Sequence, residues 1–148
     1  MAALFIAAAQ TAGLIGIPFT TVGPWYNNLE KAPFNPPSWV FGPVWTLLYL
    51  MIGYAGWRAW LAEPSRSRTL ALRGWWTQLA LNASWTPVFF GLQQPEAGLV
   101  VLLLVVVAVA ATWWHLRKAA ATAGMLFVPY LGWVLFATAL NAWIVFAN

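Results

Sequence analysis

Long apolar stretches separated by short polar segments dominate the chain. Each stretch has about 20 residues or more, the length that an α-helix needs to cross the hydrocarbon core of a bilayer. No internal repeat or separate soluble segment interrupts the pattern, so we expect a single membrane domain over residues 1–148. The pattern predicts an all-α integral membrane protein, a bundle of five transmembrane helices, with spans at about 2–22, 38–62, 70–91, 95–116 and 120–147.

The composition supports lipid as the solvent of this chain. The sequence is 62% hydrophobic and 7% charged, whereas a soluble domain carries roughly 25% charged residues. The seven basic residues are too few and too scattered to predict a nucleic-acid partner. Because the first 19 residues lack a basic segment, we expect a span there rather than a cleaved signal peptide. The absence of cysteine leaves the redox compartment open.

The first connection combines proline with aromatic side chains. Pro33, Pro36 and Pro37 fix φ and lack N–H donors, so residues 32–37 are predicted to lie outside any helix interior. Aromatic residues flank this segment on both sides, at Trp25, Tyr26, Phe34, Trp39 and Trp45. We therefore expect a long, structured first loop.

Polar residues recur at helical spacing in the third span. Gln78, Asn82 and Thr86 are four residues apart and form one stripe, which should face the bundle interior or a cavity because polar groups are costly in hydrocarbon. Trp133 and Asn141 share one face of the fifth span. In the first span, the small residues at positions 9, 12, 13 and 16 have a spacing that permits close helix contact. The alternative is that they are ordinary apolar residues without a specific packing role.

Aromatic walls with a few amides are typical of a pocket for a flat, apolar ligand. Trp39 and Trp45 begin the second span, and Asn82 and Asn141 are the amides that would orient the polar edge of a ligand. The alternative is that the indoles form interfacial belts and the amides only join helices. That alternative is favoured for the indoles near span ends, which are Trp57, Trp60, Trp113 and Trp114.

The basic residues predict the orientation in the membrane. They gather around the second and fourth connections, whereas the first connection has only Lys31. The positive-inside rule then places the N-terminus in the cytoplasm and the first loop on the opposite side. The basic residues of the second and fourth connections are Arg58, Arg66, Arg68, Arg73, Arg117 and Lys118.

Signals for catalysis are weak. The only histidine, His115, lies at a span end and is expected to be an interfacial side chain rather than a base or a ligand. Glu30, Glu63 and Glu96 are too far apart in sequence to predict a carboxylate pair. No metal ligand, no catalytic residue and no obligatory cofactor is predicted.

Three sequence blocks resemble one family. Residues 25–49 read W-Y-x-x-L-x-K-x-x-x-x-P-P-x-W-V-x-G-P-V-W-x-x-L-Y, residues 78–91 read Q-L-x-L-N-x-x-W-x-P-x-F-F-G, and residues 129–141 read P-Y-L-x-W-x-x-F-A-T-x-L-N. These motifs resemble the tryptophan-rich sensory protein / translocator protein family (TspO/MBR), also called peripheral-type benzodiazepine receptors.

The resemblance implies a homodimeric five-helix bundle that binds porphyrins or benzodiazepine-site small molecules between helices beneath the first loop. The porphyrin ligand would be protoporphyrin IX or a heme-like tetrapyrrole. Carried over by motif, the pocket comprises Tyr26, Pro37, Trp45, Tyr49, Asn82, Trp85, Phe89, Trp133, Ala137, Leu140 and Asn141.

The resemblance implies a receptor, carrier or sensor for porphyrins in a bacterial membrane. One alternative is light- and oxygen-dependent degradation of porphyrin, a role that would fall to Trp45 and Trp133; another is transport of lipophilic metabolites. Animal members carry a sterol motif with Tyr and then Arg after the last Leu-Asn, whereas residues 142–146 here read AWIVF. We therefore expect weak sterol binding.

Overall fold

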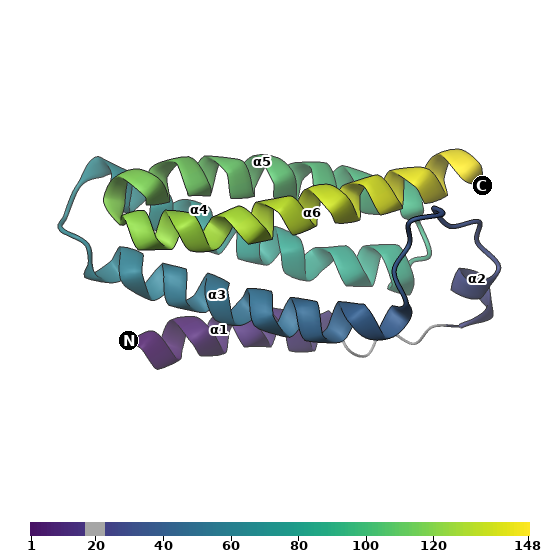
Figure 1. Cartoon of the computed structure of the whole chain (residues 1–148), viewed down its shortest axis with the longest axis horizontal. Helices are drawn as coiled ribbons and strands as arrows, with labels where there is room; N and C mark the ends of the chain where they lie inside the picture. The colour runs from purple at the N-terminus through teal and green to yellow at the C-terminus, as the bar shows by residue number, and fades with distance from the viewer. Residues whose placement is uncertain (17–22) are drawn as a thin grey trace.

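The chain folds into a bundle of long antiparallel helices (Figure 1). The computed structural model describes residues 1–16 and 23–148, so residues 17–22 of the first predicted span lie outside the described part. Every long element that it describes is helical, which confirms the all-α prediction. The long helices are α1 (Ala2–Gly16), α3 (Phe41–Leu61), α4 (Arg66–Thr86), α5 (Pro95–Ala119) and α6 (Ala121–Ala147).

The five long helices close into a ring around a common core. α1 contacts α3 and α4, α3 also contacts α6, and α5 packs against both α4 and α6. Trp75, Tyr130, Phe89 and Phe127 are the largest aromatic side chains that the bundle buries completely. Successive helices run in opposite directions, so the N-terminus and the C-terminus lie at opposite ends of the bundle (Figure 1).

Small residues allow α1 and α3 to approach closely. A Cβ atom at Gly53 would lie 2.6 Å from the Cα atom of Ile6, and one at Gly56 would lie 2.7 Å from the ring of Phe5. Ala9 and Ala12 of α1 are also buried in the bundle. A Cβ atom at Gly13 would lie 2.8 Å from the Tyr49 ring, so at least this small residue of the first span serves a close contact with α3.

The first loop is structured, as its prolines predict. It contains a short helix α2 (Pro24–Asn27) and a 3₁₀ turn η2 (Ser38–Val40), with non-helical backbone between them. The Asn148 side chain accepts from the backbone N–H of Glu30 at 2.9 Å and donates to its carbonyl at 3.0 Å. The Phe34 ring lies 6.0 Å from the ring of Trp143 on α6. These contacts hold the loop against the C-terminal end of α6.

Two helix ends differ from the predicted spans. α4 begins at Arg66 rather than at residue 70, because the Ser65 side chain caps it by accepting from the backbone N–H of Arg68 at 3.0 Å. α5 continues to Ala119 rather than residue 116, with Arg117 and Lys118 in its last turn. Basic side chains there are favourable because they face the negative end of the helix dipole.

Three helices in the described part of the chain are long and apolar enough to cross a membrane. They cover residues 38–61, 95–119 and 121–147, whereas the apolar part of α1 that is described is shorter. α4 carries Arg66, Arg68 and Arg73 together with its buried amides, which lowers its overall apolarity. Length and composition alone therefore identify three spans of the five predicted.

The close α1–α3 approach predicts a large effect of one methyl group at Gly53. Gly53→Ala should lower the free energy of unfolding by about 1–3 kcal/mol, because the added Cβ meets the α1 backbone. Gly132→Ala on α6 is the matched control, since nothing lies within 4 Å of its added Cβ. The control should be neutral or stabilising by up to about 1 kcal/mol from helix propensity. Thermal unfolding in detergent measures both, and equal stability of the two variants would contradict the close contact.

Candidate functional site

A cavity of about 490 Å³ lies between the helices beneath the first loop. α1, the first loop, α3, α4 with the turn that follows it, and α6 all contribute to its lining, with a single residue from α5. Aromatic side chains make up much of the wall, and they are Tyr26, Phe41, Trp45, Tyr49, Trp85, Phe89 and Phe90. The cavity can therefore enclose a flat apolar molecule between rings.

The wall formed by α4 depends on a π-helical turn, η3 (Pro87–Gly91). Pro87 has no N–H to donate within the α-helix, and the N–H of Leu92 instead bonds to the carbonyl of Pro87 at 2.9 Å. The turn buries Phe89, whose ring stacks on Trp85 with centroids 5.0 Å apart and an angle of 26°. Phe90, the next residue, also reaches the cavity.

Trp45 forms the wall on the α3 side. Its indole stacks on the Tyr49 ring at 5.5 Å, and Tyr130 meets it edge-on at 6.4 Å. Its other neighbour is Trp133, whose ring centroid lies 6.3 Å away at an angle of 86°. The Trp45 indole therefore separates the cavity from Trp133.

A chain of buried hydrogen bonds joins three helices at the floor of the cavity. Tyr49 donates to the Asn82 Oδ1 at 3.4 Å, and the Asn82 Nδ2 donates to the Tyr130 hydroxyl at 2.7 Å. Tyr130 in turn donates to the Gln78 Oε1 at 2.6 Å. Gln78 and Asn82 are buried and Thr86 lines the cavity, so the stripe on α4 faces the interior as predicted.

Asn141 occupies a similar bridging position at the other side of the cavity. Its Oδ1 accepts from the Trp85 indole N–H at 3.1 Å, and its Nδ2 donates to the carbonyl of Pro95 at 2.8 Å. Asn82 and Asn141 thus line the cavity and also join helices. The helix-joining interpretation is therefore confirmed for both amides, and their role in orienting a ligand stays a prediction.

The structure brings nine of the twelve predicted site residues to this cavity. They are Tyr26, Trp45, Tyr49, Asn82, Trp85, Phe89, Ala137, Leu140 and Asn141. Pro37 and Trp39 do not line it. Pro37 caps the 3₁₀ turn η2, and Trp39 is 74% exposed. With three residues per turn, consecutive side chains of η2 point in different directions, so Ser38 reaches the cavity and Trp39 points away from it.

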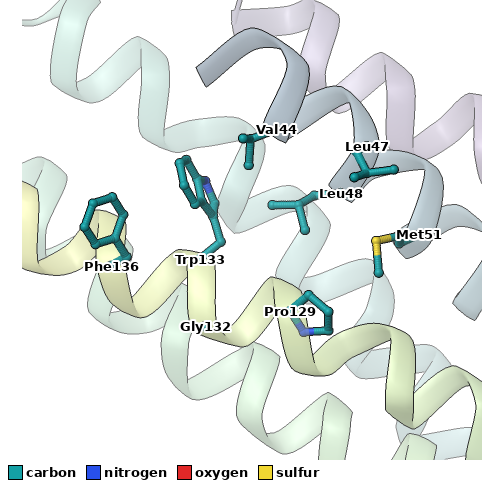
Figure 2. Close-up of a pocket in the computed structure, with 8 residues that line it drawn as sticks. All are labelled: Val44, Leu47, Leu48, Met51, Pro129, Gly132, Trp133 and Phe136. Atoms are coloured by element: carbon teal, nitrogen blue, oxygen red, sulfur yellow. The ribbon is translucent and has the colours of Figure 1, made fainter. Parts of the chain in front are cut away.

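Trp133 is the third predicted site residue outside the cavity. It lines a separate apolar groove of about 390 Å³ between α3 and α6, shown in Figure 2. Residues four apart on an α-helix are offset by about 40° around its axis. Trp133 and Asn141 are two such steps apart, so their side chains differ in direction by about 80° around α6. Its buried indole N–H has no hydrogen-bond partner among the described residues. The other groove residues are Val44, Leu47, Leu48, Met51, Pro129, Gly132 and Phe136.

Sequence reasoning missed the contribution of α1 and of the loop. Gln10 gave one available signal, because it is the only amide in the apolar first span and polar groups in such spans tend to face an interior. Asn35 and Ser38 gave no such signal, since polar residues are ordinary in loops. The cavity residues that sequence reasoning missed are Gln10, Ala12, Gly13, Leu14, Asn35, Ser38, Phe41, Gly42, Thr46, Leu102 and Ile144.

Charged and titratable groups are rare around the cavity. Burial raises the pKa of the Tyr26 phenol above 10.0, and a hydrogen bond with the Asn35 side chain opposes this shift. Tyr26 is therefore neutral at physiological pH. Within residues 1–16 and 23–148, no three His, Asp or Glu side chains gather in a way that could hold a metal ion.

The indoles assigned to interfacial belts lie away from the cavity. Arg68 lies over the ring of Trp60 at 5.1 Å, and Arg117 lies over the ring of Trp114 at 3.8 Å. Neither these two indoles nor Trp57 and Trp113 line the cavity. The pairing of Trp60, Trp113 and Trp114 with basic side chains agrees with the belt interpretation, whereas Trp57 packs edge-on against Tyr54.

The fold and the site together define a small all-helical membrane protein with an aromatic cavity beneath its first loop. The chain belongs to the TspO/MBR family, whose family model matches residues 3–147.

Relatives from several kingdoms share this family. The "Tryptophan-rich protein TspO" of Archaeoglobus fulgidus is 43% identical over 141 residues, covering 92% of this chain and 89% of that protein. "Protein CrtK" of Rhodobacter capsulatus is 37% identical over 140 residues, covering 94% and 87%. The human "Translocator protein" is 42% identical over 119 residues, covering 79% and 70%.

The hydrogen-bond chain at the cavity floor predicts that Tyr130 stabilises the bundle through its hydroxyl. Tyr130→Phe leaves buried groups of Asn82 and Gln78 without their partner and should lower the free energy of unfolding by about 1–3 kcal/mol. Tyr54→Phe, at an exposed tyrosine of α3, should change it by less than about 0.5 kcal/mol. Detergent unfolding curves of both variants test this, and a Tyr130→Phe protein as stable as the control would refute it.

Proposed function

We propose that the cavity binds a porphyrin, such as protoporphyrin IX or a heme-like tetrapyrrole, and that the protein is a membrane receptor, carrier or sensor for it. The observation that carries the proposal is the aromatic wall, in which Trp45, Trp85 and Phe89 offer stacking surfaces within one cavity. A volume of about 490 Å³ falls in the range of small-molecule sites. The names of relatives, "Tryptophan-rich sensory protein" and "Translocator protein", also support a sensor or carrier.

The arrangement in the membrane is part of the proposal. All five long helices span the bilayer, including α4, because its Gln78 and Asn82 are buried inside the bundle rather than exposed to lipid. The basic side chains around the second and fourth connections lie at the same end of the bundle as the N-terminus, as the chain path in Figure 1 supports. That end faces the cytoplasm of a bacterial cell. A homodimer, as the family resemblance implies, completes the assembly.

Two other functions compete with simple binding. Light- and oxygen-dependent degradation of the porphyrin is favoured by the Trp45 indole, which lines the cavity and contacts the second indole of Trp133. Transport is favoured by the name "Translocator protein" of several relatives. In a dark, oxygen-free sample, binding should persist whereas oxidative turnover stops. Flux into liposomes would identify a transporter.

A titration of protoporphyrin IX into the purified protein tests the binding function. Trp45→Phe should weaken binding by about 1 kcal/mol, roughly fivefold, because a smaller ring remains in the wall. Trp133→Phe is the matched control, since Trp133 lines the groove and not the cavity. It should leave the affinity unchanged. Equal losses of porphyrin affinity in both variants would indicate that the porphyrin binds in the groove rather than in the cavity. If the wild-type protein did not bind porphyrin, the proposal would be refuted.

Cysteine labelling tests the orientation, since the chain has no native cysteine. A cysteine at Ser67, near the start of α4, should react only with a reagent on the cytoplasmic side. A cysteine at Asn28, in the first loop, should react only from the opposite side. The reverse pattern would contradict the orientation and leave the fold unaffected.

A further inference from the structure

The lining of the cavity is neutral. Among the described residues that line it, none is Asp, Glu, Lys, Arg or His. The amides of Asn82 and Asn141 already bridge helices through both their oxygen and nitrogen atoms. A ligand carboxylate buried at this depth would lack a cationic partner, which is strongly unfavourable. An anionic group is therefore better placed toward the loop, where Asn35 and Ser38 contribute polar side chains to the lining.

Lys31 lies beside the cavity at its loop end. Its Nζ is 4.6 Å from the centre of the Tyr26 ring, and Tyr26 lines the cavity. The ammonium donates to the carbonyls of Asn27 at 3.4 Å and Leu29 at 3.2 Å. Because an ammonium has three N–H donors, these two bonds leave one donor for a ligand. The loop backbone and the Tyr26 ring thus hold a cation in place against a residue of the cavity wall.

Lys31 is also the single basic residue at this end of the molecule. The other six of the seven Lys and Arg residues lie near the second and fourth connections, at the opposite end of the bundle. α3 alone separates the two ends by about 30 Å, given its 21 residues and a rise of 1.5 Å per residue. Glu30 and Glu96, near the loop end, repel an anion. Among the described residues at the loop end, Lys31 is therefore the only attractive charge available to an anionic ligand.

We propose that Lys31 binds the carboxylate of the cavity's ligand and sets its orientation. The ligand class is a flat apolar ring system with carboxylates on one edge. That edge lies at the loop beside Lys31, Asn35 and Ser38, and the ring extends toward the aromatic wall and the floor at Tyr49 and Asn82. This inference rests on the proposed porphyrin-binding function and deepens it, because it assigns the propionate side chains to the loop end.

The experiment compares two porphyrins on the full-length protein in detergent. Protoporphyrin IX carries two carboxylates, whereas its dimethyl ester has the same ring without charge. Lys31→Gln should weaken binding of the diacid by about five- to tenfold at low salt, the size expected for a charge-assisted hydrogen bond near a surface. Binding of the ester should not change. Lys31→Arg should restore most of the affinity for the diacid, and 0.5 M salt should reduce the difference.

Lys118→Gln, at the opposite end of the bundle, is the matched control and should affect neither porphyrin. Equal weakening of diacid and ester by Lys31→Gln would overturn the inference, because it would mean that the residue acts only through the shape of the loop. Unchanged binding of both porphyrins to Lys31→Gln would also overturn it. If the wild-type protein bound neither porphyrin, the proposed function itself would fail, a result distinct from these two.

Discussion

The bundle depends on satisfying the polar groups of its least apolar helix, α4. In a bilayer no water is available to replace a missing hydrogen bond, so buried polar side chains must pair within the protein. Tyr49, Asn82, Tyr130 and Gln78 do this with one continuous chain of bonds across α3, α4 and α6. This chain fixes how α4 is rotated in the ring. Once α4 is placed, Trp85 and Phe89 necessarily face the same interior space.

The cavity exists because the packing changes along the bundle axis. Toward the N-terminal end, Gly53 and Gly56 bring α1 and α3 together and Trp75 fills the core. Toward the loop end, the π-helical turn after Pro87 replaces regular packing with aromatic side chains that surround a space. The first loop then covers this end, held to α6 through Asn148. Close packing at one end and a covered aromatic cavity at the other follow from the same five helices.

Much of the cavity could be predicted from the sequence, and the predicted residues that do not line it lie elsewhere for specific physical reasons. Motif and periodicity together identified nine cavity residues, and the polar stripe on α4 faces inward as expected. Residues four apart share a helix face, which predicts Trp133 beside Asn141, but that face turns steadily around the helix and brings Trp133 to the groove. Trp39 was assigned from its place in an aromatic segment, and the tight 3₁₀ turn directs it outward.

The sequence by itself determined the all-helical class, the approximate helix positions, the proline-rich loop and the family, because these depend on local periodicity, chain stiffness and motifs. The tertiary structure alone decided that α1 lines the cavity and that Trp45 separates the cavity from the groove. It also decided that Lys31 lies against Tyr26, a residue of the cavity wall. The physical reason is that periodicity establishes which residues share a helix face. Only the packing of helices against one another establishes which neighbour that face meets.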